Sequence, residues 1–194
     1  MKARRKKGFT MAELLIVVAI VGVLVAISIP IFNKHIEKTR ETYDIATMRQ
    51  AASAAIDLYY AGINDQASAN AVGLNWDSGG KESGTNAYGA YDPKTGRFYK
   101  SRGDLPESSR KYGKGTKTDG GMTFVRGNAN GAYNPTLDYT NAVVMVSIYC
   151  KASRPHVDIY WKDNNYPGQL GKDKYVGGNE ETNIPKYSMR ITLN

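Results

Sequence analysis

A single carboxylate, Glu13, stands at the start of a long apolar run that extends from Leu14 to Phe32. A charge at the centre of a membrane-spanning helix costs about 2.5–3.5 kcal/mol to insert. An acid beside such a run therefore indicates a function and requires a partner. Five basic residues come before it, namely Lys2, Arg4, Arg5, Lys6 and Lys7.

Patterns for catalysis and metal binding fail. Cys150 is the only cysteine, so no intramolecular disulfide can form, and nothing near His156 indicates a reactive thiolate. We expect Cys150 to be buried in a strand. The calcium-loop-like "DNNYPGQLGKDK" (Asp163–Lys174) has Pro at position five and Lys at position twelve, where an acid is required. Because no phosphate-loop or zinc spacing is present either, the sequence predicts no enzyme, no metal site and no cofactor.

A second candidate site is the basic segment 94–117. It contains eight basic residues and only two acidic ones, Asp104 and Glu107, which gives a local charge of +6. Aromatic residues are interleaved with the basic ones. Phosphate contacts combined with aromatic stacking bind nucleic-acid single strands, so DNA or another anion is a candidate partner. A solvated loop gives the same pattern, and we favour that alternative. The bases are Lys94, Arg97, Lys100, Arg102, Arg110, Lys111, Lys114 and Lys117.

The charge of the whole chain says little about partners. The formal net charge is +8, from 26 basic and 18 acidic residues. Without the five bases that precede Gly8, the balance is 21 against 18, or +3.

The apolar run could belong to a secretory signal peptide or to a membrane anchor. It is 19 residues long, interrupted only by Ser28 and Pro30, and no small-residue cleavage site follows it. A signal-peptide core is shorter, about 7–15 residues, whereas about 20 apolar residues span a bilayer. We therefore expect an anchor, with its basic N-terminal side cytoplasmic and residues 33–194 outside.

The stretch "KKGFTMAELL" resembles the processing site of the type IV prepilins, the class III signal-peptide family. The resemblance implies that a prepilin peptidase removes leader 1–8 by cutting between Gly8 and Phe9, and that Phe9 is then N-methylated. It also implies that Glu13 pairs with the N-terminus of a neighbouring subunit as helices bundle into a filament. The resemblance covers the first 60 residues or so.

Two residues inside the run disfavour a regular helix. Gly22 costs about 1 kcal/mol relative to Ala, and Pro30 removes a backbone donor. The resemblance implies that the segment between them unwinds on assembly; a permanent simple kink is the alternative.

The remaining sequence predicts an α+β fold, a long N-terminal helix packed on an antiparallel sheet, which is the fold the resemblance implies. We expect the helix over Phe9–Ala61, about 80 Å long, with 9–32 in the membrane or filament core and 33–61 amphipathic. Its apolar stripe is Ile36, Tyr43, Met48, Ala52, Ala55 and Tyr59, with Lys, Arg and Glu elsewhere.

The head, residues 62–194, should hold four strands joined by turns. A turn is expected at "DPKTG" (Asp92–Gly96), a hairpin at "SRP" (Ser153–Pro155), and long loops over 64–120 and 162–185. Many Gram-negative pilins close the later loop with a disulfide, so its absence favours a Gram-positive source. The strands are Gly121–Gly127, Ala142–Cys150, His156–Trp161 and Lys186–Leu193, and Val157, Ile159 and Trp161 should face the helix.

Together these patterns predict a structural subunit of a type IV pilus that serves adhesion, motility or DNA uptake. Its partners would be further copies of itself, the prepilin peptidase and the assembly machinery. It would be anchored by 9–32 before assembly and lie in an extracellular filament afterwards. A pseudopilin of a secretion or competence machine, and a singly anchored surface binding protein, are the alternatives.

Overall fold

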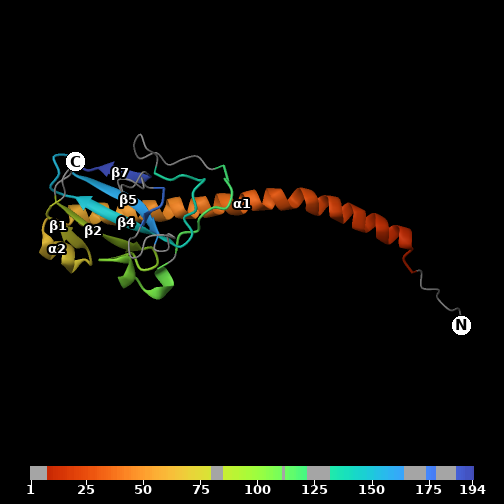
Figure 1. Ribbon diagram of the computed structural model, residues 1–194, viewed down its shortest axis with the longest axis horizontal. Helices are drawn as coiled ribbons and strands as arrows, with labels where there is room; N and C mark the ends of the chain where they lie inside the picture. Colours follow the sequence, from red (N-terminus) through yellow and green to blue (C-terminus); the bar gives the residue numbers. More distant parts are fainter. Residues whose placement is uncertain (1–7, 80–84, 111, 122–131, 164–173, 178–186) are drawn as a thin grey trace.

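One long helix, α1 (Met11–Tyr60), runs through the whole molecule (Figure 1). The computed structural model describes residues 8–79, 85–110, 112–121, 132–163, 174–177 and 187–194. Thr10 caps the first turn: its hydroxyl accepts a hydrogen bond from the Glu13 amide, and the Glu13 carboxylate accepts one from the Thr10 amide. After the C-cap Ala61, Gly62 has a φ of +95°, which ends the helix. The predicted helix is confirmed, with each end within two residues.

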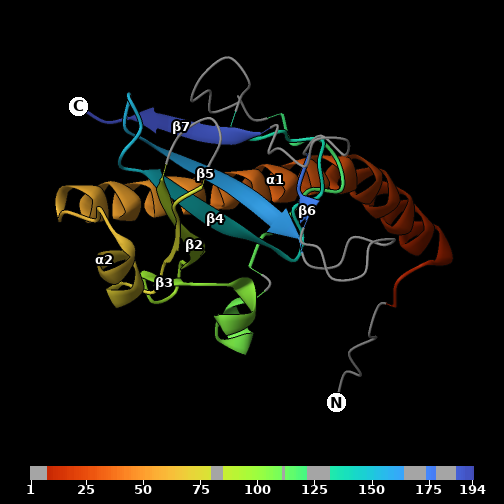
Figure 2. The same ribbon diagram turned by 60° about the vertical axis from the view of Figure 1, so that its left-hand side comes forward.

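An antiparallel sheet forms the head and packs against the C-terminal half of α1 (Figure 2). Its three central strands are, in spatial order, β2 (Asn86–Asp92), β4 (Ala142–Tyr149) and β5 (His156–Asp163). Strands β4 and β5 pair over their full length, so the predicted hairpin at Ser153–Pro155 is confirmed. The predicted α+β architecture is confirmed as well.

Short strands complete both edges of the sheet. β1 (Asn75–Asp77) and β3 (Arg97–Tyr99) pair with β2, while β6 (Lys174–Tyr175) and β7 (Ser188–Thr192) pair with β5. β7 confirms the last predicted strand. β6 lies within the predicted loop 162–185, so that part of the segment is a strand of the sheet. The predicted strand Gly121–Gly127 lies outside the described residues except for Gly121.

The helix-facing side of the sheet consists of alternate residues of β4 and β5. The predicted set Val157, Ile159 and Trp161 alternates along β5 and is almost completely buried, at 0%, 0% and 1% exposed. Trp161 connects to α1 through stacked rings: it packs on Tyr139, which stacks on Tyr133 at 4.3 Å, and the Tyr133 hydroxyl donates to Asp44 of α1. The buried residues of α1 in this region are Met48, Ala51, Ala52 and Ala55. Three of them are alanines, whose small side chains let the helix approach the sheet closely.

The segment 64–120 is not a loop, so that prediction is wrong. It contains β1, β2 and β3, the short helix α2 (Gln66–Ala71) and two 3-10 turns, Arg102–Asp104 and Glu107–Ser109. β2 has the sequence "NAYGAYD", whose Ala and Gly are poor strand formers. Gly89 is required there because a Cβ would lie 2.5 Å from the Tyr99 carbonyl oxygen of β3. The turn predicted at Asp92–Gly96 is confirmed and joins β2 to β3.

Cys150 also differs from expectation. It lies one residue beyond the end of β4 and is half-buried, not enclosed in a strand. Partial burial raises the pKa of its thiol, which disfavours the reactive thiolate.

Three acidic residues of α1 are buried, contrary to the predicted apolar stripe. Glu37, Glu41 and Asp44, here called the carboxylate row, are 5%, 0% and 0% exposed. Their spacing of four and then three residues places them on one face of the helix. Tyr43, assigned to the stripe, is instead 40% exposed. A buried carboxylate costs several kcal/mol unless donors satisfy it, so the row requires a matching set of donors.

The donors are backbone amides of the strap, residues 113–121, which runs along α1 beside the row. Lys114 and Gly115 donate to the two oxygens of Asp44 at 2.8 and 3.1 Å. Further along, the amide of Lys117 donates to Glu37 at 2.7 Å and that of Gly120 donates to Glu41 at 2.9 Å. Hydrogen bonds to charged groups contribute about 1.5–3 kcal/mol each. The row therefore fixes the strap, and with it the head, to this part of the helix.

We predict that Gly120→Ala loosens the strap. A Cβ at this position would lie 2.4 Å from the Lys38 backbone nitrogen of α1, so the strap must move away from the helix. Overpacking of this kind costs about 1–3 kcal/mol. The expected result is a lower urea midpoint and faster hydrogen exchange at the Lys117 and Gly120 amides. Gly103→Ala is the control, since its nearest neighbour is 3.4 Å away; equal effects of the two changes would contradict the close contact.

The second prediction concerns pH. Burial raises the pKa of Asp44 from 3.8 to about 6, against the opposing effect of its hydrogen bonds from the strap. Between these two pKa values the folded chain binds the extra proton, so this group adds stability as the pH falls from 6 towards 4. The gain is up to about 3 kcal/mol. The stability of wild type relative to Asp44→Asn should therefore rise over that range, measured by urea unfolding at each pH. A constant difference would contradict the raised pKa.

Candidate functional site

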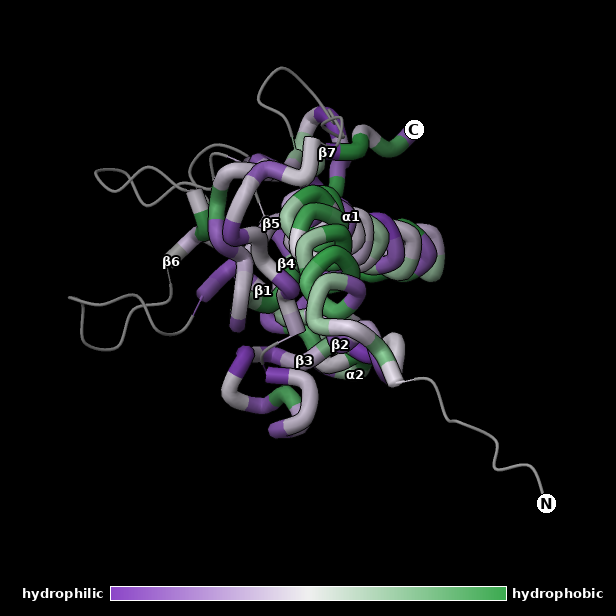
Figure 3. The backbone as a smooth tube through the Cα atoms, turned by 90° about the vertical axis from the view of Figure 1, so that its right-hand side faces the viewer, coloured by the Kyte–Doolittle hydropathy of each residue, from purple (hydrophilic) through white to green (hydrophobic). Residues whose placement is uncertain are grey.

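The N-terminal half of α1 is apolar and uncovered. The large apolar residues from Phe9, just before the helix, to Phe32 are between 47% and 87% exposed. Figure 3 shows hydrophobic colours along this end of the helix, while polar colours increase towards the head. Within the described residues, α1 is the one helix long and apolar enough to cross a membrane, judged by length and composition. A surface this apolar requires lipid or other protein around it.

Glu13 has a partner in its own first turn. One carboxylate oxygen, Oε2, accepts hydrogen bonds from the Thr10 amide at 2.8 Å and the Thr10 hydroxyl at 2.9 Å. No donor among the described residues reaches the other oxygen, Oε1. Sequence reasoning missed Thr10, although Thr-x-x-Glu is the pattern of a capping box. The carboxylate can therefore cap its own helix and still offer an oxygen to a second group.

The residues assigned to processing lie at the free end of this helix. Gly8 and Phe9 precede the N-cap and are exposed, so the peptide bond between them is accessible. Whether it is cleaved stays a prediction.

α1 passes through Gly22 and Pro30 without interruption. Pro30 has no amide to donate to the carbonyl one turn earlier, and the Ser28 hydroxyl donates to the Leu24 carbonyl oxygen at 2.6 Å. This stretch therefore has weaker backbone bonding than the rest of the helix. Its unwinding on assembly remains a prediction.

The basic segment 94–117 does not form one surface. Arg102 is buried and donates to the Lys162 carbonyl oxygen, Lys94 donates to that of Ser108, and Arg110 donates to those of Gly103 and Leu105. The Lys114 ammonium lies 4.8 Å from the Tyr43 ring centre, in a cation–π contact. Four of the eight bases therefore stabilise the fold, and Lys111 lies outside the described residues. DNA or anion binding here stays a prediction that this dispersed arrangement does not favour.

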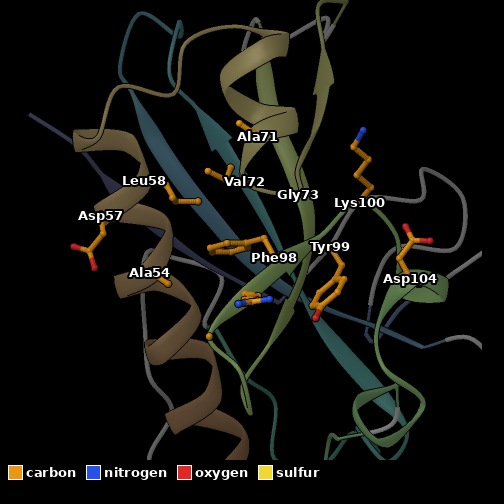
Figure 4. Close-up of a pocket in the computed structure, with 12 residues that line it drawn as sticks. Ala54, Asp57, Leu58, Ala71, Val72, Gly73, Phe98, Tyr99, Lys100 and Asp104 are labelled. Atoms are coloured by element: carbon orange, nitrogen blue, oxygen red, sulfur yellow. The ribbon is translucent and has the colours of Figure 1, made fainter.

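Two of the remaining bases, Arg97 and Lys100, line an open groove of about 760 Å³ between α1, α2 and β3 (Figure 4). Phe98 points from β3 towards Leu58 of α1, which makes this part of the groove apolar. Asp57 and Asp104 carry opposite charge on its rim. The groove therefore has mixed charge, unlike a phosphate-binding surface.

Comparison with known proteins matches only part of the chain. The family described as the prokaryotic N-terminal methylation motif matches residues 3–29. A fimbrial protein of Pseudomonas aeruginosa is 41% identical over 56 residues, which are 27% of this chain and 36% of that protein. The type IV major alpha-pilin of Moraxella bovis is 43% identical over 54 residues, 26% of this chain and 34% of that one.

A third relative matches over fewer residues at a higher identity. The type IV major fimbrial protein FimA of Dichelobacter nodosus is 54% identical over 35 residues, 18% of this chain and 22% of that protein. The chain thus spans about a third or less of the length of these relatives. No solved structure matches the chain at a comparable level of significance. The methylation motif and these relatives make the matched part of the chain similar to type IV pilins and fimbrial proteins, and the long helix on an antiparallel sheet is consistent with that similarity.

Proposed function

We propose that the chain is a structural subunit of a type IV pilus. The observation that carries the proposal is the exposed apolar half of α1, which bears the methylation motif at its start and continues without a break into the helix of the head. Such a helix can lie in a membrane as a monomer and then exchange lipid for identical helices in a filament. The head needs no rearrangement for that exchange, because its core is complete without residues 9–32.

The parts of the chain then have distinct roles. A prepilin peptidase removes 1–8; residues 9–32 anchor the subunit and later form the filament core; residues 33–61 and 62–194 form the exported head. The N-terminal basic cluster favours a cytoplasmic N-terminus before assembly. The free oxygen of Glu13 supports pairing with the new ammonium of a neighbouring Phe9. A buried charge without its partner is costly, so this pair would select the correct register between subunits.

A pseudopilin of a secretion or competence machine would share all these N-terminal features. Electron microscopy of surface filaments before and after deletion of the gene tests the proposal. Loss of the filaments on deletion, with their restoration by the gene, supports a pilus subunit. Unchanged filaments would contradict that function.

Processing gives the first prediction here. We expect the assembled protein to begin with N-methylated Phe9, and Gly8→Ala to block maturation, because the peptidase is expected to cut after this glycine. Mass spectrometry of the N-terminus measures both. An intact leader in filament protein would contradict the processing step.

A second prediction separates the two roles of Glu13. Glu13→Gln keeps an oxygen that can accept from Thr10 but removes the charge, whereas Glu13→Ala removes both. Because pairing with an ammonium requires the charge, we expect both variants to insert into the membrane and both to give much less pilus than wild type. Sheared filaments and membrane fractions are quantified by immunoblotting.

The comparison between the variants decides between pairing and capping. If Glu13→Gln assembles as well as wild type while Glu13→Ala does not, the carboxylate acts as a helix cap alone. The loss of a cap by itself costs about 0.5–2 kcal/mol of helix stability.

A further inference from the structure

Three lysines cluster on one side of α1 just beyond its apolar half, and we infer that this group, Lys34, Lys38 and Lys117, here called the collar, binds the headgroups of anionic phospholipids. The inference rests on the proposed membrane-spanning state of residues 9–32. The collar belongs to the membrane-anchored subunit before assembly, on the side of the membrane that carries the head.

The position of the collar follows from helix geometry. The apolar run Leu14–Phe32 is about 28 Å long as a helix, close to the roughly 30 Å hydrocarbon core of a bilayer. Lys34 and Lys38 then lie about 3 and 9 Å beyond Phe32 along the axis. Lys117 reaches the same level from the strap, because its amide donates to Glu37. Long lysine side chains can bend towards the interface from these positions.

The strap is what makes this surface basic. In the sequence, Glu37 and Glu41 balance the neighbouring lysines. In the fold both carboxylates are buried and accept strap amides, so their charge is turned away from solvent. The three lysines are exposed, and within the described residues none of their ammonium groups has an ion-pair partner.

The other charged groups near the collar do not cancel the positive charge of its three lysines. Arg40 pairs with Glu37 at 3.0 Å, and the exposed acid Asp119 accepts the Gly121 amide. The strap passes directly over the lysines: a Cβ on Gly120 would touch the Lys38 backbone, and one on Gly121 would lie 3.6 Å from the Lys34 side chain. Helix and strap therefore present their lysines side by side. Anionic lipid attracts each basic residue near its surface, by roughly fivefold in binding.

The test uses the full chain reconstituted into phosphatidylcholine bilayers with trace spin-labelled lipid. Electron paramagnetic resonance gives the preference of the protein-bound lipid shell for phosphatidylglycerol over phosphatidylcholine. We expect a clear preference in wild type that is largely lost when Lys34, Lys38 and Lys117 are all changed to Gln. The control changes Arg49, Arg97 and Lys100 to Gln, which removes the same charge from exposed positions on the head and should leave the preference unchanged.

An unchanged preference in the collar variant overturns the inference. So does an equal reduction in both triple variants, because it would reflect net charge and not the collar. If the collar variant keeps its lipid preference but fails to form filaments, the lysines contact other subunits and the lipid assignment is wrong. Resistance to extraction by alkaline carbonate tests independently whether the chain spans the membrane. Release of the wild-type chain by carbonate contradicts the proposed membrane-spanning state. If the chain is retained but shows no preference for phosphatidylglycerol, only the lipid-binding role of the collar is wrong.

Discussion

The burial of three carboxylates on α1 is the constraint on which the rest of the structure depends. Glu37, Glu41 and Asp44 would be too costly to bury without donors, and the strap supplies backbone amides to each of them. Backbone donors suit this task because they bring no compensating charge and need only a close approach of the chain. The head is thereby fixed to α1 from Glu37 onwards, five residues after Phe32. The apolar half of the helix, which ends at Phe32, makes no such contact with the carboxylate-bound strap.

This division gives one helix two environments. Beside the sheet, α1 contributes small residues and Met48 to a core closed by the rings of Tyr133, Tyr139 and Trp161. Beyond the strap, it exposes its apolar side chains on every face. Because the helix is continuous, a force applied at its N-terminal end reaches the head through backbone hydrogen bonds. One backbone donor is missing from that path at Pro30.

The distribution of charge also depends on the fold. The segment 94–117 carries the largest local charge in the sequence, yet four of its bases are held by carbonyl groups or an aromatic ring. By contrast, Lys34 and Lys38 have acids close by in the sequence, but in the fold those acids are buried against the strap while the lysines stay exposed. A cluster of like charges along a chain is therefore a weak guide to a charged surface in three dimensions.

The sequence by itself determined the long helix, its methylation motif and the strands β4, β5 and β7, because these depend on local pattern. Helix caps, apolar runs and alternating branched residues act over a few positions. It did not determine β2, in which Gly89 is required for the close approach to β3, nor the carboxylate row. Residues such as Glu37 and Asp44 have the spacing of an ordinary solvated face. Only the tertiary structure brings residues 113–121 beside them, some 70 to 80 positions away along the chain, and those donors decide that the acids are buried.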